Sequence, residues 1–598
     1  MYLAKVTVLL DKHLKAKHPD FFGSKASHPF AELRPFKDIH DPIWGTNRFS
    51  WRELAIVDSP IMQRLRRIHQ TGLAYYIYPS ARHSRFEHSL GVVTVASRVF
   101  DAVAQRYAGR LEEIADSLKR SSDKIDDTVS RWRQELRLAA LLHDTGHSLL
   151  SHASERIYAE LELLKSAAEE LSELAAGKKK AGEVLSFCLS KTDALSGLLA
   201  RAKPKLMKES DLTGEYDGDL DMENVSLLIL GRSRHPLQHF MGDIISSGFD
   251  ADKLDYLLRD AAAAGLPLRY DLERYLSTVY LPKPDLYDQK GKLQRLYQSA
   301  EPVPTRHPPR EGGTDPYYTS CRLRLPKRSM NTIEQITICK LMLTSYIYQH
   351  QKVRAAEGLF ERLLLRVLRN WQSPGGTGVG RTRNGKQKKG KRPKTDEEIV
   401  PLFLDLDDTS LQGDEFLDSD DQEIREISYR LVNRLLPRVV YEISATAEEP
   451  HDTYLTDFFS RLEDDDARED VLHELDTIAG TELIRRRSEL KGGSGDVDPK
   501  AACRRAGVWF DVPWVPRFEG MDELIDGSDR EFPVKVGEMF PINKWLEAYQ
   551  KYRLTLRVFS FSEYCSDVAV AAEKALKKVT RVTDHEFYQR CRRIRTPN

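Results

Sequence analysis

The stretch Leu141-Leu142-His143-Asp144-Thr145-Gly146-His147 closes a mostly apolar run that begins at Leu136. Such a run predicts a buried helix with the His-Asp pair at its end. Burying two ionisable side chains costs free energy unless a metal ion or polar partners satisfy them. Imidazole nitrogen and carboxylate oxygen suit a divalent or transition metal that keeps positions open for water and substrate. The stretch therefore predicts a metal site; the alternative is that the pair only caps a helix.

Segments elsewhere in the chain carry the same residue types. Arg85-Phe86-Glu87-His88-Ser89 adds a histidine beside an arginine, and Asp250-Ala251-Asp252-Lys253 adds an aspartate beside a lysine. A single histidine such as His88 more often has a structural role. We interpret His88 as a metal ligand because of the residues that surround it in the sequence.

In this order, the segments resemble the HD-domain phosphohydrolases. Within that family they are most similar to the deoxynucleoside triphosphate (dNTP) triphosphohydrolases, which include a mammalian SAM-and-HD-domain enzyme and bacterial dGTPases. Besides the His-Asp stretch, the matching blocks are residues 36–45, 58–66, 68–72, 81–91, 252–260 and 348–352. The resemblance implies cleavage of a dNTP to deoxynucleoside and tripolyphosphate, by attack of water on the phosphorus nearest the sugar.

The resemblance also implies which residues hold the metal ion and which move protons. The implied metal ligands are His88, His143, Asp144 and Asp252, around a divalent ion that is Mg, Mn, Fe, Co or Zn. The implied catalytic residues are His147, which would meet the phosphate next to the scissile bond, and the proton-transfer pair His152 and Glu155. A histidine oriented by a carboxylate suits general acid work on a leaving oxygen.

Two positions depart from the family pattern. The usual acid three residues after the second histidine of the catalytic group is aspartate, and this chain has Glu155. A further His-Glu pair, expected downstream, falls on Met222-Glu223, so that histidine is missing. These departures leave open whether another histidine substitutes or whether the chemistry is slower or different.

By the same resemblance, a group of polar and aromatic residues binds the substrate. Arg85 and Lys253 supply cations for a triphosphate, whose charges a single divalent ion cannot neutralise. Tyr256 would stack under the sugar and disfavour a 2′-hydroxyl. Asp260 and Gln70 would bind the 3′-hydroxyl, and Tyr348 would complete the pocket. For the two tyrosines, plain helix packing is the alternative.

A guanine-nucleotide effector site is the next expectation from the resemblance. The corresponding residues are Lys37, Asp58, Gln63 and Arg66. An aspartate can accept from the N1 and N2 hydrogens of guanine, and an arginine can donate to its carbonyl. His40, however, stands where the mammalian relative has an amide residue, and this block also serves core packing.

Composition and patterning predict a mostly α protein. Apolar spacing predicts helices over residues 111–137, 153–176, 334–371 and 568–578. We expect an HD core over residues 1–370 with helical insertions near 109–135 and 160–220. A basic flexible loop over 371–400 and a smaller C-terminal helical and mixed α/β lobe over 401–598 follow. Flexibility is expected for the loop because Lys386 to Lys394 is almost free of apolar residues.

Charge and cysteines constrain location and partners. Lys+Arg and Asp+Glu both number 91, so net charge points to neither nucleic acid nor membrane. The six cysteines show no CxxC spacing, which argues for a reducing cytoplasm and against a zinc ribbon. No apolar run has the roughly 18–20 residues of a membrane span, and no secretion signal is recognisable at Met1.

Three functions are therefore compared. The favoured one is the dNTP triphosphohydrolase. The second is an HD-type phosphodiesterase or nuclease on a cyclic nucleotide or oligonucleotide, suggested only by the basic loop. The third is a partner-gated nucleotide sensor, suggested by Met222. The family analogy further suggests a homo-oligomer and an antiviral defence role with a partner protein.

Overall fold

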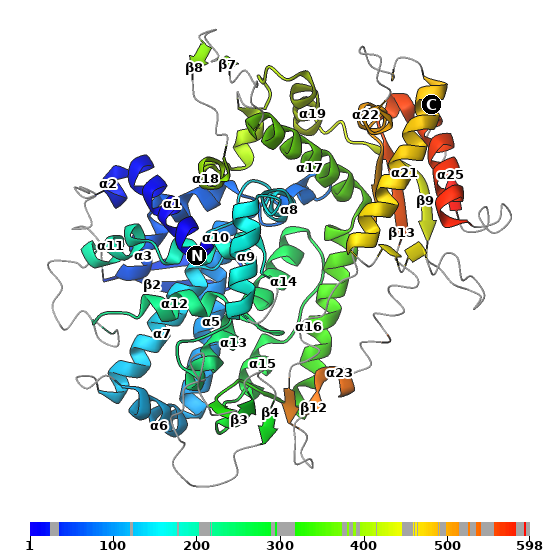
Figure 1. Ribbon diagram of the computed structural model, residues 1–598. Coiled ribbons are helices and arrows are strands. Elements are labelled where there is room, and N and C mark those ends of the chain that lie inside the picture. Colours follow the sequence, from blue (N-terminus) through cyan, green and yellow to red (C-terminus); the bar gives the residue numbers. More distant parts are fainter. Residues whose placement is uncertain are drawn as a thin grey trace.

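The computed structural model describes most of the chain. The described residues are 1–23, 35–119, 124–175, 179–202, 216, 218–288, 293–295, 317–372, 379–381, 387–389, 395–413, 416–444, 458–459, 461–462, 465–487, 490, 498–512, 524–526, 534–539, 544, 555–581 and 591–593. Helices dominate them and the sheets are small, which confirms the predicted mostly α fold (Figure 1).

The centre of the larger lobe is a group of helices around the His-Asp stretch. α7 (Ile125–Leu142) and α14 (Ala251–Ala263) both pack on α5 (Arg85–Arg106). Each begins where its sequence supplies a cap. Ser84 and Glu87 form a capping box before α5, and Asp250 accepts a hydrogen bond from the Lys253 N–H at the start of α14.

Other elements surround this group. They are α1 (Tyr2–Lys17), α2 (Pro19–Phe22), β1 (Phe36–Asp41), β2 (Gly45–Ser50), α3 (Trp51–Val57), α4 (Pro60–Gln63), η2 (Arg64–Arg67), η3 (Gly72–Tyr76), α6 (Ala108–Leu118), α8 (His152–Tyr158), α9 (Glu162–Ala175), α10 (Ala181–Ser190), α11 (Asp193–Arg201), α12 (Met222–Ile229), η5 (Pro236–Gln238), α13 (His239–Ile245) and α15 (Leu272–Thr278). One continuous hydrophobic core runs through them.

The chain then continues toward the second lobe. Here lie β3 (Asp285–Asp288), β4 (Leu293–Arg295), β5 (Tyr317–Ser320), β6 (Leu325–Pro326), η6 (Lys327–Ser329), α16 (Met330–Leu343), the π-helical turn η7 (Thr344–Tyr348), α17 (Gln351–Gln372), β7 (Val379–Arg381), β8 (Gln387–Lys389), α18 (Asp396–Ile399), η8 (Val400–Leu404), η9 (Asp408–Gln412) and α19 (Gln422–Val432). Most of the predicted basic loop, including most of 386–394, lies outside the described residues.

Several predicted helices are divided in the structure. The range 111–137 splits between α6 and α7, and 153–176 splits between α8 and α9. The range 334–371 is interrupted by η7. A π turn adds a residue to the helical turn and often marks a functional position; here it ends at Tyr348. The first break, residues 119–124, contains no apolar residue in the sequence, whereas apolar residues continue through the other two, so periodicity alone did not reveal those two.

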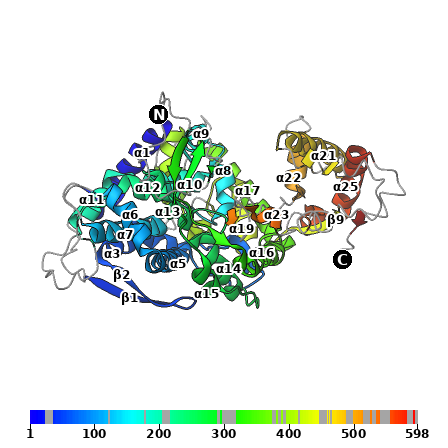
Figure 2. The same ribbon diagram turned by 90° about the horizontal axis from the view of Figure 1, so that it is seen from below.

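A second hydrophobic core lies in the C-terminal lobe. Its four-stranded sheet has the order β10-β13-β9-β14, and Figure 2 shows this lobe standing apart from the helical one. The elements of this lobe are β9 (Arg438–Ser444), α21 (Asp465–Arg486), α22 (Pro499–Arg505), β10 (Trp509–Asp511), β13 (Thr555–Ser560), η12 (Ser562–Tyr564), α25 (Cys565–Thr580) and β14 (Cys591–Arg593). Three other elements, β11 (Leu524–Asp526), β12 (Val534–Lys535) and α23 (Val536–Met539), belong to the larger lobe instead, because β11 pairs with β6 and Val536 packs in the larger core.

The two lobes meet along α17. Asp511 of β10 accepts hydrogen bonds from the buried Arg354 guanidinium, the shorter at 2.7 Å. Gly358 has no side chain where a Cβ would lie 2.3 Å from the Trp509 ring. The C-terminal lobe is therefore docked on α17 by a buried ion pair and a close aromatic contact.

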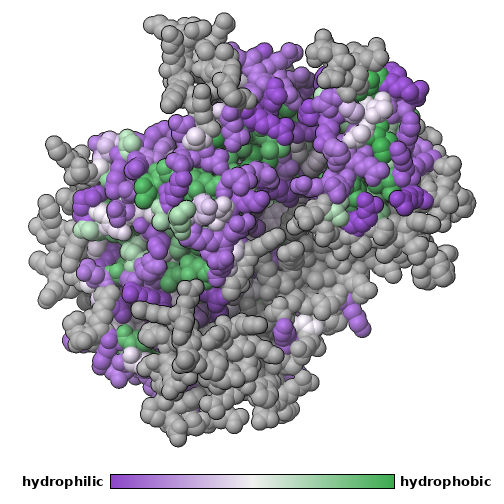
Figure 3. Space-filling model, viewed as in Figure 1, coloured by the Kyte–Doolittle hydropathy of each residue, from purple (hydrophilic) through white to green (hydrophobic). Residues whose placement is uncertain are grey.

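The surface gives no sign of a membrane span. On the face in Figure 3, hydrophilic residues surround several separate hydrophobic areas. Among the described residues, no helix is both long and apolar enough to cross a bilayer.

Candidate active site

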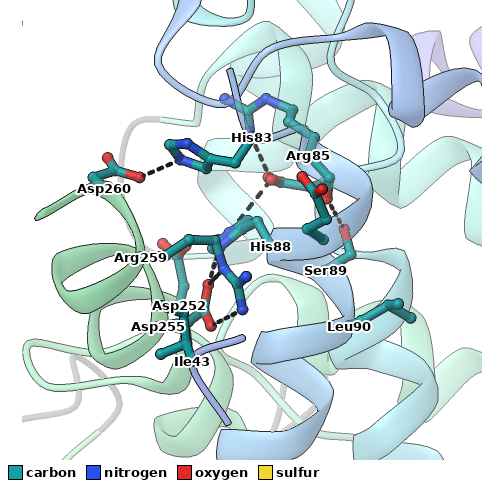
Figure 4. A network of polar contacts seen from close by, with 12 residues as sticks. Ile43, His83, Arg85, His88, Ser89, Leu90, Asp252, Asp255, Arg259 and Asp260 are labelled. Carbon is teal, nitrogen blue, oxygen red and sulfur yellow. Dashed lines mark hydrogen bonds and ion pairs between the residues drawn. The ribbon is translucent and has the colours of Figure 1, made fainter. Parts of the chain in front are cut away.

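His88 lies in the first turn of α5 and is completely buried. Its Nδ1 is 2.7 Å from Asp255 Oδ2, so the imidazole donates from Nδ1 and its Nε2 is free to bind a metal. Nε2 lies 3.0 Å from Asp252 Oδ1 and 3.6 Å from Asp144 Oδ2. Figure 4 shows the two α14 carboxylates, Asp252 and Asp255, beside the ring.

His143 caps the C-terminus of α7. Its Nδ1 is 2.7 Å from the Ala140 carbonyl oxygen, which only accepts, so Nδ1 carries the hydrogen and Nε2 again points outward as a potential ligand. Within the part of the chain that is described, the buried Nε2 atoms of both His88 and His143 have no hydrogen-bond partner. With Asp252 they present ligand atoms within 4.8 Å of one another.

This donor set fits a divalent metal ion. Two imidazole nitrogens left without hydrogen bonds and a facing carboxylate are a chemically suitable ligand group. The orphaned nitrogens are costly without a partner. Asp144 stands beside the three, with Oδ1 3.4 Å from His143 Nε2. The structure thus brings together all four residues expected to bind the metal.

The electrostatics of the centre favour positive charge. Burial alone would lower the pKa of His88, but Asp252, Asp255 and Asp144 together raise it to about 10. Burial also opposes ionisation of Asp144, yet Arg85 and the neighbouring imidazoles hold the pKa of that carboxyl well below its usual value. The site is therefore a buried group of carboxylates that a proton or a cation must balance.

Asp255 was not anticipated from the sequence. It is fully buried and also accepts two hydrogen bonds from Arg259, each at 2.8 Å. Arg259 in turn donates to Asp41 of β1 at 2.8 Å. Asp255 follows Asp252 by three residues and precedes Arg259 by four, so helical spacing was the available signal.

The three residues expected to be catalytic also lie together. His152 Nδ1 is 2.7 Å from Glu155 Oε2, and His147 Nδ1 is 3.5 Å from Glu155 Oε1. Burial opposes ionisation of Glu155, but the two imidazoles hold its pKa below the usual value. His147 Nε2 is 3.2 Å from Asp144 Oδ1, which joins this group to the metal-ligand group.

Met222 and Glu223, which stand where the His-Glu pair was expected, make structural contacts. Met222 begins α12 and packs against the hydrophobic core, while Glu223 pairs with Lys191. The residue that lies against the proton-transfer group is Gly182 of α10. Its N–H donates to Glu155 at 3.2 Å, and a Cβ there would lie 2.3 Å from Glu155 Oε1 and 3.1 Å from the His147 ring.

Arg85 connects the metal and proton-transfer groups. Its guanidinium pairs with Asp144 and donates from Nε to Ser151 Oγ at 2.6 Å. Its Nη2 lies 3.3 Å from His152 Nε2. Lys253, by contrast, directs its ammonium to Asp250 Oδ2 at 2.8 Å. Of the two cations expected to bind a triphosphate, Arg85 thus bridges the two groups, whereas Lys253 is anchored at the cap of its own helix.

The expected sugar-binding residues are partly assembled. The Tyr348 hydroxyl donates to Asp260 Oδ2 at 2.5 Å. His83, not singled out from the sequence, lies with Nε2 2.8 Å from Asp260 Oδ1; Figure 4 shows this contact beside the metal-ligand group. Gln70 Oε1 is buried and unpartnered among the described residues. Tyr256 is half-buried on the same helix as Asp260.

The expected effector residues lie on consecutive elements. Lys37 is exposed on β1, and Asp58 is exposed at the end of α3. The Arg66 Nε donates to Gln63 Oε1 at 3.0 Å, and its guanidinium covers the Phe86 ring.

Known proteins share parts of this sequence and fold. A model of the HD domain matches residues 85–223. Deoxynucleoside triphosphate triphosphohydrolase SAMHD1 of Bos taurus is 30% identical over 252 residues, 40% of this chain and 38% of that protein. The Homo sapiens SAMHD1 is 28% identical over 247 residues, 40% of this chain and 35% of that protein.

Other relatives are less informative about activity. An uncharacterised protein of Methanocaldococcus jannaschii is 27% identical over 333 residues, 56% of this chain and 50% of that protein. The chain thus spans half or less of these curated relatives. A solved structure of a hypothetical protein from Aquifex aeolicus, 19% identical, superposes with a TM-score of 0.52 over 90% of this chain and 99% of that one. That likeness concerns the fold alone.

Proposed function

We propose that this chain, which belongs to the HD-domain family and is related to the SAMHD1 dNTP triphosphohydrolases, is a metal-dependent dNTP triphosphohydrolase. The observation that carries the proposal is the pair of buried, unpartnered imidazole nitrogens of His88 and His143 facing Asp252. A proton-transfer group and a buried arginine lie directly beside them. Such a combination suits hydrolysis of a phosphate ester better than binding alone.

His88, His143, Asp144 and Asp252 would hold the metal ion. A divalent ion bound there supplies an acidified water and polarises a phosphate oxygen. Asp255 contributes by holding the His88 ring in the tautomer that leaves Nε2 available. Metal analysis of the purified protein would identify the ion.

His152 and Glu155 would deliver the proton to the departing sugar oxygen. Glu155 holds the Nδ1 hydrogen of His152, so Nε2 is the atom that faces the reaction. In the structure Nε2 lies beside Arg85. A triphosphate that engages the Arg85 guanidinium would free His152 Nε2 to carry a proton and donate it.

The substrate class follows from the sugar-binding residues. Both oxygens of Asp260 are fixed, by Tyr348 and by His83, and a carboxylate so held can accept from a 3′-hydroxyl. The unpartnered Gln70 Oε1 is a second acceptor. Tyr256 and Tyr348 supply rings that would crowd a 2′-hydroxyl. These features support a deoxynucleotide over a ribonucleotide.

Regulation and assembly are part of the proposal. Lys37, Asp58, Gln63 and Arg66 would bind a guanine-nucleotide effector, with the chain acting as a homo-oligomer. A role in antiviral defence with a partner protein is proposed by analogy only. The cytoplasm is the proposed compartment.

The test is incubation of the purified protein with each dNTP and NTP, singly and mixed, with Mg²⁺, Mn²⁺ or Co²⁺. A His143→Ala/Asp144→Ala variant is the blank. We expect deoxynucleoside and tripolyphosphate from dNTPs only, with none from the variant. Turnover only in mixtures would support the effector site. Absence of any dNTP turnover, with cleavage of a cyclic nucleotide or oligonucleotide instead, would overturn the proposal.

A further inference from the structure

The turn before His152 has a strained backbone. Leu150 and Ser151 have φ of 53° and 61°, a region that residues with a Cβ avoid because of close contacts with the backbone. Such conformations persist only where surrounding contacts hold them. Because His152 follows immediately as the first residue of α8, its position depends on what holds this turn.

One carboxylate from far along the chain does so. Asp408 begins η9, and its side chain is only 7% exposed. Its Oδ1 accepts a hydrogen bond from the Leu150 N–H at 2.6 Å. Its Oδ2 accepts from the His69 N–H at 2.8 Å and also pairs with the His69 ring. Asp408 therefore joins the strained turn to the segment that carries Gln70.

The turn before His152 and the segment that carries Gln70 also contact each other directly. A Cβ on Gly72 would lie 3.1 Å from the Leu150 carbonyl oxygen. Ser151 Oγ donates to the Gln70 carbonyl oxygen at 3.2 Å while it accepts from Arg85. The turn, the Gln70 segment and Arg85 thus form one connected unit.

Neighbours of Asp408 attach the same stretch to the larger lobe. Asp407 pairs with Arg67 of η2, and the Ser148 hydroxyl donates to the Phe403 carbonyl oxygen at 2.8 Å. Residues 403–408 therefore lie against the turn that joins α7 to α8. They reach the active site through Asp408.

We propose that Asp408 is a positioning residue that fixes His152, the proton donor, relative to Gln70, the sugar-binding residue. The inference rests on the proposed function. Asp408 acts through Leu150 and His69 and touches no reacting atom. With the carboxylate in place, the strained turn holds His152 over the scissile bond while Gln70 holds the sugar.

The test compares Asp408→Asn with Asp405→Asn. In the first variant an NH₂ group replaces one carboxylate oxygen, so it faces the N–H of either Leu150 or His69 and one anchor is lost. Asp405 lies in the same stretch, but pairs with His13 and Lys17 at 3.0 Å, on α1. It is the matched control for loss of a carboxylate.

We measure dGTP hydrolysis, metal content and hydrogen exchange of peptides covering 148–154. Asp408→Asn is expected to lower kcat on the order of 10- to 100-fold, as small misplacements of catalytic groups do. KM and metal content should stay within about threefold of wild type. Exchange at 148–154 should accelerate, Asp405→Asn should match wild type, and Asp408→Glu should regain part of the kcat.

Distinct results separate this inference from the proposed function. Wild-type kcat in Asp408→Asn, or a loss shared equally by Asp405→Asn, would overturn the positioning role. A wild-type protein that hydrolyses no nucleotide would overturn the proposed function. Hydrogen exchange alone would then test whether Asp408 holds the turn. Faster exchange at 148–154 in Asp408→Asn only would support the positioning role, and unchanged exchange would refute it.

Discussion

Replacing Asp255 by asparagine tests how a residue that contacts a metal ligand, His88, supports the metal centre. The carboxylate accepts from His88 Nδ1, from two Arg259 nitrogens and from Trp44 Nε1. In either orientation an asparagine presents its NH₂ group to two of these four donors. Each lost charge-assisted bond in a buried site costs about 1.5–3 kcal/mol, so folding should lose about 3–5 kcal/mol, as for other broken buried ion pairs.

Metal affinity should fall as well, because the His88 tautomer is no longer fixed. Loss of such a supporting carboxylate typically costs about 10- to 100-fold in affinity. Asp511→Asn is the matched control: it removes a buried carboxylate from the Arg354 guanidinium in the other lobe. It should lose comparable stability with no change in metal binding.

The assay is competition for Mn²⁺ or Co²⁺ against a chromophoric chelator, together with a denaturant midpoint for each variant. If Asp255→Asn binds metal as tightly as wild type while both variants lose similar stability, the proposed support of the metal site by Asp255 is refuted.

Further predictions concern the neighbouring groups. Gly182→Ala should lower kcat on the order of tenfold or more, because its Cβ would lie 2.3 Å from Glu155 Oε1; Gly109→Ala, with nothing within 4 Å, should leave kcat unchanged. The pKa of metal-free His88 is raised to about 10, so a metal ion must displace the proton of His88 in order to bind. Metal affinity should therefore increase with pH, up to about tenfold per pH unit, as long as the pH is below about 10. The raised pKa of His88 also stabilises the metal-free fold, fully below about pH 6.5, and this contribution to the free energy of unfolding should decline as the pH rises toward 10. Metal affinity and stability that do not change with pH would contradict this prediction. Tyr348→Phe removes the hydroxyl that holds the sugar-pocket carboxylate and should raise KM for dNTPs several-fold in steady-state assays, with metal content unchanged.

Local patterns predicted much of the fold and the grouping of site residues. The apolar run before His143 does form a buried helix, α7, that ends at Leu142. The blocks around His88 and Asp252 place both side chains at the ends of α5 and α14 nearest this point. These positions depend on helix starts and stops, which caps and apolar spacing encode.

Local sequence patterns could not predict contacts between segments that lie far apart in the chain. Asp408 meets Leu150 across 258 residues, and no periodicity links them. Lys253 was expected to bind the triphosphate because it follows Asp252 directly in the sequence. Successive side chains on a helix diverge by about 100°, however, and Lys253 points to Asp250 instead. Similarly, no sequence pattern singled out Gly182; its importance follows from its close approach to Glu155 in the structure.

Hydrolysis of a dNTP in H₂¹⁸O tests the proposed reaction at the bond that breaks. Water attack on the phosphorus nearest the sugar breaks its bond to the 5′-oxygen, which leaves with a proton as the deoxynucleoside. We expect one ¹⁸O atom in tripolyphosphate and none in the deoxynucleoside, only with divalent metal bound. Release of pyrophosphate or orthophosphate, or turnover that survives the His143→Ala/Asp144→Ala substitution, would contradict it.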